Sequence, residues 1–343
     1  MRQIRLGRTG LMVTEVGFGG IPIQRLSEQE AVPLVRRCLD LGITFLDTAN
    51  GYSTSEERIG KAIAGRRDGL VLATKTGARD GAGVAGHLAL SLERLGVETI
   101  DLYQFHGVSS DEDYEKVLAP AGPLAVVREA QACGQVRHIG LTSHSMDVAL
   151  RAVRSGHFET IMFPFNFIAN EAAQELIPLA TERDVGFIAM KPLAGGALDN
   201  VTLAFTYLRQ FPEILPIPGI ERAEEIEQII AVMQGPAEMT PDEQEEIQRL
   251  QAELGNRFCR RCGYCQPCPE GVSVQPLMIL DSIVKRMPPA DVFAEFTQLV
   301  EAADACSECG ECEEKCPYEL PIREMINQRV ELFHSEMGRA GLP

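Results

Sequence analysis

The most distinctively spaced residues are eight cysteines in the last quarter of the 343-residue chain. They form two runs, Cys259-x2-Cys262-x2-Cys265-x2-Cys268-Pro269 and Cys306-x2-Cys309-x2-Cys312-x3-Cys316-Pro317. The second run has a spacing typical of cysteines that bind [4Fe–4S] clusters. Two four-thiolate zinc sites are the alternative, but zinc sites usually pair one CxxC with a distant CxxC. The third cysteine and the Cys-Pro therefore favour iron–sulfur clusters.

Four other side chains have types suited to acid–base chemistry and follow apolar runs that read as strands. Asp47, Lys75 and His106 each end such a run, and Tyr52 lies in the loop after Asp47. Each alone has an ordinary explanation, such as a turn cap or a solvated lysine. Together, on three successive strand ends, they indicate a functional site.

Eight short apolar runs alternate with amphipathic stretches over the first 235 residues. The runs are Glu15–Gly20, Ile43–Asp47, Leu70–Lys75, Ile100–His106, Val136–Thr142, Thr160–Pro164, Val185–Lys191 and Ile214–Pro218. The helical stretches include Ser27–Leu41, Ser55–Ala64, Gly86–Leu95, Leu124–Cys133, Asp147–Ser155, Glu171–Arg183 and Arg222–Met233. This alternation predicts an α/β protein with a (β/α)8 TIM barrel. A doubly wound sheet is the alternative, which the lack of a GxGxxG after the first strand disfavours.

The chain is expected to have three parts: the barrel over 1–235, a connecting helix within 236–256, and a small, mainly helical domain over 257–343. Ile4–Val13 reads as a hairpin ahead of the barrel. Thr240 followed by Pro241 and Glu243 is a helix-starting sequence. Val272–Val300 has helical patterning and suits a spacer between the two cysteine runs.

Composition limits the classes of partner and compartment. The net charge of −17 argues against nucleic acid or an anionic membrane as the main partner. The longest stretch without Asp, Glu, Lys or Arg, Gly81–Leu92, is too short to span a bilayer. The first residues lack the apolar core of a signal peptide. We therefore expect a cytoplasmic protein, in which disulfides are disfavoured.

Seven segments of the chain, from Arg5 to about Met233, resemble the aldo-keto reductase family in order and spacing. They are GITFLDTANGY, EERIGKAI, VLATK, SLERLGVETIDLYQFH, GQVRHIGLTSH, MKPLAGGAL and IPGIERAEEIEQI. The resemblance implies NAD(P)H-dependent reduction of an aldehyde or ketone. Tyr52 would be the general acid, Lys75 would make the phenol a better acid, Asp47 would hold Lys75, and His106 would position the carbonyl.

The resemblance also implies cofactor positions, which are Thr142, Ser143, Lys191, Leu193, Gly195 and Gly219. The chain departs from the family at three places. Met162 stands where a Gln is usual, and Met190 where an aromatic ring is usual. Glu225 replaces a basic residue near the adenosine phosphate, although Arg222 is close in sequence. NADPH, NADH and a flavin all remain open as the redox cofactor.

The cysteine region resembles a ferredoxin module with two [4Fe–4S] clusters. That resemblance assigns Cys316 to the cluster of Cys259, Cys262 and Cys265, and Cys268 to the cluster of Cys306, Cys309 and Cys312. The gap before Cys268 is one residue shorter than usual, so each run could instead bind its own cluster. The remaining cysteines, Cys38 and Cys133, are expected to be buried thiols. His87, His138, His144, His157 and His334 are expected to be structural.

Three functions remain open because nicotinamide gives up a hydride whereas a cluster takes one electron at a time. The barrel could reduce a small carbonyl substrate while the clusters are structural or redox-sensing. A flavin could split electron pairs in an electron-transfer reductase with a ferredoxin-like donor. The chain could also be a non-catalytic, redox-responsive binding subunit, which the complete set of four residues disfavours. An electron-transfer partner protein would be basic or weakly charged.

Overall fold

The computed structural model describes residues 1–342 and divides into two compact units, Met1–Gln244 and the residues from Glu245 on. The dividing point lies inside the segment expected to connect two domains. Each unit has its own apolar core. Among the described residues, no helix combines the length and apolar character needed to cross a membrane.

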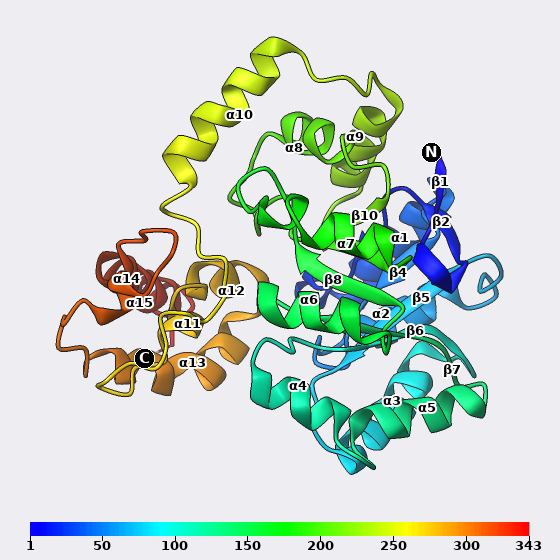
Figure 1. The fold of residues 1–343 in the computed structure, drawn as a ribbon, viewed down its shortest axis with the longest axis horizontal. Coiled ribbons are helices and arrows are strands. Elements are labelled where there is room, and N and C mark those ends of the chain that lie inside the picture. The colour runs from blue at the N-terminus through cyan, green and yellow to red at the C-terminus, as the bar shows by residue number, and fades with distance from the viewer. Residues whose placement is uncertain (343) are drawn as a thin grey trace. The chain divides into compact units, whose positions relative to one another are not determined.

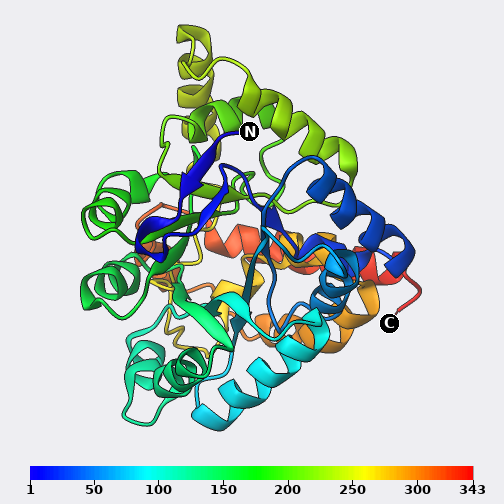
Figure 2. The ribbon, with the colours of Figure 1, turned by 90° about the vertical axis from the view of Figure 1, so that its right-hand side faces the viewer.

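The first unit is built on eight parallel strands that follow one another around a barrel in chain order, β3 to β10 (Figures 1 and 2). They are β3 Phe18–Gly19, β4 Phe45–Asp47, β5 Val71–Thr76, β6 Ile100–Phe105, β7 Val136–Thr142, β8 Thr160–Pro164, β9 Gly186–Met190 and β10 Ile214–Ile217. A bridge between Gly19 and Gly219 joins the first strand to the last. The predicted TIM barrel is confirmed, and all eight strands lie within the expected runs or one residue beyond them.

Helices alternate with these strands on the outside of the barrel (Figure 2). They are α1 Glu28–Asp40, α2 Ser55–Ile63, α3 Gly81–Leu95, α4 Asp111–Leu118, α5 Pro123–Ala132, α6 Met146–Ser155, α7 Leu176–Glu182, α8 Val201–Leu208 and α9 Ala223–Gln234, with short 3-10 turns at η2 Pro22–Arg25 and η3 Glu171–Ala173. Two differ from the expected stretches. α3 begins five residues early because Asp80 caps it through a 2.8 Å bond from the Gly83 N–H. The stretch 171–183 divides into η3 and α7.

The N-terminal hairpin closes one end of the barrel. β1 Gln3–Arg5 and β2 Met12–Thr14 pair antiparallel around η1 Gly7–Thr9, as predicted. Ile4, Leu6 and Val13 join the apolar core inside the strands. Gly7 has φ +52°, and a Cβ there would lie 2.2 Å from the Gly186 nitrogen, so the close approach requires glycine. The opposite end of the barrel, where the strands end, is the end at which TIM barrels carry their active sites.

The second unit is helical. α10 Pro241–Leu254 begins with the expected capping box, in which the Thr240 N–H donates to Glu243 at 2.8 Å. The other helices are α11 Val274–Leu277, α12 Leu280–Arg286, α13 Pro289–Ala303, α14 Glu311–Glu314 and α15 Ile322–Arg339. Helices therefore fill the predicted spacer between the two cysteine runs. The apolar core of this unit has six of the eight cysteines packed against it.

A glycine contact between two helices gives a stability prediction. A Cβ on Gly60 of α2 would lie 2.4 Å from the Arg94 carbonyl oxygen in α3. Gly60→Ala must push the helices apart and should lower the free energy of unfolding by about 1–3 kcal/mol. Gly86→Ala is the control, because Gly86 is an exposed α3 position with open space around it, and should raise that free energy by roughly 0.5–1 kcal/mol. Urea unfolding followed by circular dichroism measures the free energy of unfolding of both variants. Equal stability of Gly60→Ala and Gly86→Ala would contradict the close packing of α2 against α3.

Candidate active site and cysteine sites

A buried ion pair joins the ends of two neighbouring strands. Asp47 is the last residue of β4, and Lys75 is the second-last residue of β5. The lysine Nζ donates to the Asp47 Oδ1 at 2.5 Å and to the Thr48 carbonyl at 2.7 Å. Both side chains are almost fully buried, at 2% and 4% exposed. The pairing of parallel strands brings the two ends to the same edge of the barrel.

The second oxygen of this carboxylate is held by Gln104 of β6, whose Nε2 donates to the Asp47 Oδ2 at 3.1 Å. Burial raises the pKa of Asp47, while Lys75 and Gln104 oppose that shift. Burial alone would lower the pKa of Lys75, but the Asp47 charge and the Tyr52 side chain outweigh it, so the net pKa is raised. The ammonium therefore stays charged at neutral pH. Gln104 was not predicted from the sequence, because its position inside an apolar run carries no distinguishing signal.

Tyr52 lies in the loop between β4 and α2, beside the ammonium. The Lys75 Nζ is 4.9 Å from the centroid of the Tyr52 ring, within range of a cation–π contact. The loop is pinned by Ser55, whose hydroxyl accepts from Thr48 and donates to the Gly20 carbonyl, both at 2.8 Å. Because Ser55 is also the first residue of α2, the start of that helix and the Tyr52 loop are anchored together.

His106 follows β6 directly and completes the group of four. Its ring meets the Tyr52 ring edge to face, with centroids 5.6 Å apart and planes at 82°. Its backbone N–H donates to the Thr76 carbonyl at 2.8 Å. Tyr52 and His106 are partly exposed, whereas Asp47 and Lys75 are buried. The structure thus brings all four predicted residues together, with the two that would touch a ligand on the open side.

Two of the predicted cofactor residues use their hydroxyls in hydrogen bonds to backbone groups of nearby loops. The Thr142 Oγ accepts from the Gly107 N–H at 2.8 Å. The Ser143 Oγ, fully buried, donates to the Ser145 carbonyl at 3.1 Å and accepts from its N–H at 3.0 Å. Both residues lie at the end of β7, on the edge that carries Lys75. Their observed contacts shape the loop, and cofactor binding by them stays a prediction.

The other predicted cofactor residues follow β9 and β10. Lys191 has φ +56°, a strained conformation for a side-chain-bearing residue, and its carbonyl accepts from the buried Asn166 Nδ2 at 2.9 Å. Leu193 and Gly195 continue this loop, where Gly195 has φ +73°. A lysine and a glycine turn suit phosphate groups. Gly219 has another reason to be glycine, since a Cβ there would lie 2.7 Å from the Pro22 ring.

The methionines at the departures from the family pattern have different surroundings. Met162 is buried in the core inside the barrel, at 2% exposed. Met190 ends β9 and is partly buried against the same core. Neither supplies the aromatic ring that the family usually stacks on nicotinamide. Glu225 makes an ion pair with Arg222 at 3.0 Å and receives the N–H groups of Glu221 and Arg222, so it caps α9.

In the second unit, four cysteine side chains line one cavity. They are Cys259, Cys262, Cys265 and Cys316, which come from both runs. Arg260 and Arg261 also line this cavity, and no described carboxylate does. Burial, together with Cys259, Cys262 and Cys312, raises the pKa of Cys265 to about 12. Crowded thiols that oppose one another's ionisation are what a bound cluster would neutralise, so the donor set fits an iron–sulfur cluster.

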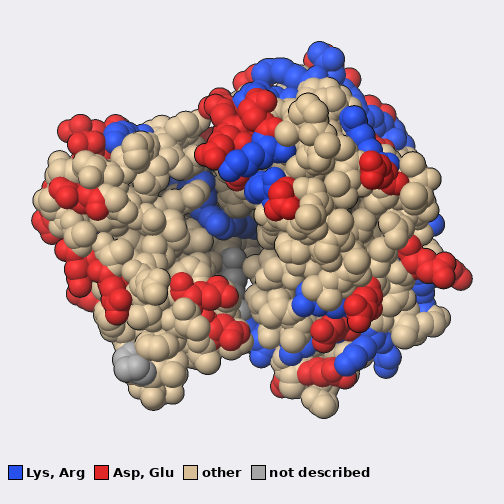
Figure 3. Space-filling view, turned by 90° about the horizontal axis from the view of Figure 1, so that it is seen from below, with Lys and Arg blue, Asp and Glu red and all other residues tan. Residues whose placement is uncertain are grey.

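The second run has acidic surroundings. Burial, then Glu313 and Cys306, raises the pKa of Cys312. Cys309 is exposed. Figure 3 shows acidic side chains on this unit, at the left, and the chain from residue 245 on has 17 acidic and 10 basic residues. Among the described residues, no three His, Cys, Asp or Glu side chains converge on a single metal ion.

The remaining cysteines and histidines lie outside these sites. Cys38 is buried as expected, and burial raises its pKa to about 12. The expectation for Cys133 is wrong: it is exposed, because it ends α5 as the C-cap residue next to Gly134. The rings of three histidines have polar partners at 2.7–3.0 Å, which are Thr76 for His87, Glu159 for His138 and Arg128 for His157. The ring of His334 lies against Phe333, and His144 donates its N–H to Ser109.

Removing the lysine should expose the electrostatic cost of this site. Lys75→Met leaves the Asp47 carboxylate buried without its cation and should lower the free energy of unfolding by about 3–5 kcal/mol at neutral pH. Burial raises the pKa of Asp47, so the native variant binds a proton that the unfolded chain releases. Its stability should therefore fall as pH rises from 5 to 8. The double variant Asp47→Asn/Lys75→Met, which has no charge at either position, should recover most of the lost free energy of unfolding. Urea unfolding is measured across this pH range. If the double variant were no more stable than Lys75→Met, the buried ion pair would be contradicted.

Comparison with known proteins agrees with this geometry. Residues 15–202 match the model of the aldo/keto reductase family, and residues 258–321 match that of a 4Fe-4S dicluster domain. An uncharacterized oxidoreductase of Bacillus subtilis, YqkF, is 30% identical over 217 residues, which is 59% of this chain and 68% of that protein.

Solved structures share the barrel. The holo form of aldo-keto reductase AKR11C1 from Bacillus halodurans superimposes with a TM-score of 0.65 at 24% identity, covering 73% of this chain and 96% of that one. An aldo/keto reductase from Klebsiella pneumoniae, solved with NADP and acetate, has a TM-score of 0.62 at 22% identity, covering 73% and 95%. The chain therefore belongs to the aldo/keto reductase family of oxidoreductases and carries a C-terminal 4Fe-4S dicluster domain.

Proposed function

We propose that the barrel reduces an aldehyde or ketone with NADPH or NADH, and that Tyr52 delivers the proton. The observation that carries this proposal is the position of the Lys75 ammonium, which is buried against Asp47 and faces the Tyr52 ring at 4.9 Å. A buried cation beside a phenol favours the phenolate that remains after proton transfer. The family membership of the chain supports the same reaction class.

In this mechanism each of the four residues has one task. Tyr52 donates its hydroxyl proton to the carbonyl oxygen as that oxygen gains negative charge. Lys75 stabilises the tyrosinate, and Asp47 fixes the ammonium through the 2.5 Å bond. His106, whose ring lies against Tyr52, donates a hydrogen bond that places the carbonyl oxygen beside the phenol. The reaction adds one hydride at carbon and one proton at oxygen, which gives the alcohol.

A nicotinamide cofactor fits the proposal in part. When bound, it supplies the hydride for the carbonyl carbon. Lys191 and the glycine turn at Gly195 would hold its phosphates, with Leu193 beside them, while Thr142, Ser143 and Gly219 would flank it on the same edge. The Klebsiella pneumoniae structure with NADP supports this cofactor class. The Glu225 carboxylate at the cap of α9 would repel a 2′-phosphate, which favours NADH over NADPH.

The cysteine unit is proposed to hold two [4Fe–4S] clusters that serve electron transfer or redox sensing. When bound, a cluster exchanges one electron at a time. The cavity lined by thiols of both runs supports the assignment of Cys316 to the cluster of Cys259, Cys262 and Cys265. Cys268 would then serve Cys306, Cys309 and Cys312. The crowded cysteines fit a reducing compartment such as the cytoplasm.

A flavin-bridged electron-transfer reductase is the second candidate. Met190 favours it, because this partly buried residue occupies the strand end where the family usually stacks an aromatic ring on nicotinamide. A flavin converts between electron pairs and single electrons, which would link a hydride donor to clusters. In that case the acidic surface of the cysteine unit would suit a basic protein partner (Figure 3). The absorption spectrum of anaerobically purified protein separates the two candidates, since bound flavin has its own bands.

Replacing the proposed acid tests the reductase directly. Tyr52→Phe should lower kcat for reduction of 4-nitrobenzaldehyde by roughly 10²–10⁴-fold, because it removes the proton donor and little volume. The rate is followed by the absorbance of NADPH or NADH. Tyr207→Phe is the matched control, since Tyr207 lies in α8 within an aromatic cluster with Phe165 and Phe211. Full turnover in Tyr52→Phe would show that the role is wrongly assigned.

Removing one cysteine of the second run tests whether the two runs hold two iron–sulfur clusters with Cys316 as a ligand. Cys316→Ala should lower the iron and acid-labile sulfide content by about half, because one cluster loses a ligand while the other keeps its four. Cys133→Ala is the control, since this exposed cysteine lies outside both runs. Iron and sulfide are measured chemically after anaerobic purification. Zinc without sulfide would contradict the iron–sulfur assignment, and equal iron in both variants would contradict the role of Cys316.

A further inference from the structure

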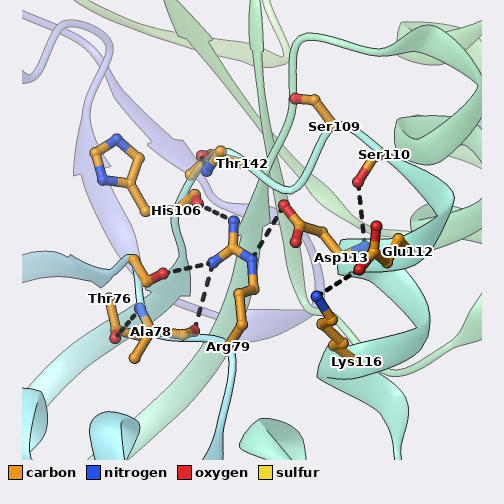
Figure 4. A network of polar contacts seen from close by, with 12 residues as sticks. Thr76, Ala78, Arg79, His106, Ser109, Ser110, Glu112, Asp113, Lys116 and Thr142 are labelled. Atoms are coloured by element: carbon orange, nitrogen blue, oxygen red, sulfur yellow. Dashed lines mark hydrogen bonds and ion pairs between the residues drawn. The ribbon is translucent and has the colours of Figure 1, made fainter.

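A single arginine connects two of the loops at the candidate active site. Arg79 lies in the loop between β5 and α3, and its guanidinium extends to the loop after β6 (Figure 4). The Nη2 donates to the His106 carbonyl at 2.7 Å, and the Nη1 donates to the Gly77 carbonyl at 3.1 Å. The Nε lies 3.3 Å from an Asp113 carboxylate oxygen. The side chain is only 20% exposed, so water competes only weakly for the groups that make these contacts.

The contacts of Arg79 need the shape of arginine and not only its charge. The guanidinium is planar and presents five N–H donors in fixed directions. It therefore donates hydrogen bonds to its own loop and to the His106 carbonyl while its positive charge pairs with Asp113. A lysine ammonium at this position keeps the charge that pairs with Asp113, but it lacks the rigid fork that bonds the Arg79 loop and the His106 carbonyl together.

Asp113 is held so that it can receive this arginine. It lies in the first turn of α4, and its backbone N–H donates to the Ser110 cap at 3.1 Å. A carboxylate at this end of a helix is stabilised by the helix dipole. Figure 4 shows the Asp113 side chain turned toward Arg79 and the neighbouring Lys116 paired with Glu112 instead. The outer end of the arginine thus has a fixed anchor.

The Arg79 guanidinium also donates a hydrogen bond to the backbone carbonyl of His106. The N–H of His106 is bonded to Thr76, and the N–H of Gly107 to Thr142, both at 2.8 Å. The carbonyl between these two N–H groups is bonded by Arg79. The peptide after His106 therefore has a donor on its oxygen as well as an acceptor for its nitrogen, which prevents it from rotating.

We propose that Arg79 is a positioning residue of the carbonyl site, which fixes the His106 backbone and so the direction of its ring against Tyr52. This inference rests on the reductase function proposed above. The ring of His106 is 5.6 Å from that of Tyr52, and the carbonyl oxygen must lie where both can reach it. A rotation of the His106 peptide would move the imidazole away from that point, and a misplacement of about 1 Å costs rate steeply.

The experiment compares variants of Arg79 with a matched arginine elsewhere in the same barrel. Arg79→Lys keeps the charge and removes the fork, and Asp113→Asn removes only the outer anchor. Arg209→Met is the control: Arg209 also donates to backbone carbonyls, those of Val232 and Pro236, but it lies beyond α8, far in sequence from the four residues. Thermal unfolding by circular dichroism first establishes that each variant is folded.

Two readouts test the folded variants. In Arg79→Lys, kcat for 4-nitrobenzaldehyde should fall about tenfold or more, while the affinity for the nicotinamide cofactor, measured by fluorescence titration, stays the same. The ring resonance of His106, assigned with His106→Asn among the six histidines, should shift in Arg79→Lys. Asp113→Asn should give a smaller fall in kcat and a smaller shift of the His106 resonance. Arg209→Met should change neither. A loss of cofactor affinity equal to the loss of kcat would indicate general disruption and overturn the positioning role.

The two readouts also separate this inference from the function on which it rests. If the wild-type protein does not reduce the aldehyde, the proposed function fails, and the histidine spectrum alone decides whether Arg79 orients His106. If the wild type is active but Arg79→Lys keeps its kcat and its His106 resonance, the positioning role is wrong and the reductase stands.

Discussion

A lysine ammonium and an aspartate carboxylate, bonded at 2.5 Å inside the barrel, impose the strictest constraint on this protein. Two charges at this depth are tolerated only when each has its partner and its remaining hydrogen bonds. Gln104 donates to the second oxygen of Asp47, and the Thr48 carbonyl accepts a further hydrogen bond from Lys75. The neighbouring strand ends must therefore keep their register, and the loop that carries Tyr52 must pass beside a cation that cannot move.

The loops around this pair are held by the same kind of contact. Side chains donate to backbone carbonyls of neighbouring segments: Ser55 to Gly20, Asn166 to Lys191 and Arg79 to His106. Such bonds satisfy buried carbonyls and fix the directions in which functional side chains leave the backbone. At the opposite end of the barrel, the N-terminal hairpin packs into the apolar core and so contributes to stability. This division between a functional and a structural end is usual in TIM barrels.

The cysteine unit presents two thiol environments of different charge. Arg260 and Arg261 line the cavity of the first run, whereas Glu313 lies against the second. Positive charge near a cluster favours its reduced form and negative charge opposes it, since reduction adds an electron to an already anionic group.

The sequence alone was enough to predict the eight strands, the cysteine runs and the four residues of the candidate active site. Buried parallel strands are apolar runs, thiol ligands follow fixed spacings, and reactive groups at strand ends share one edge. Tertiary structure alone decided which supporting residues contact them. Gln104 and Asn166 lie in apolar segments, and Arg79 is one of many loop arginines, so composition does not mark them. The tertiary structure also leaves Cys133 exposed, although this cysteine of a predicted helix was expected to be a buried thiol. Such contacts depend on the direction of each side chain across strand and loop boundaries, and residues far apart in the chain set that direction.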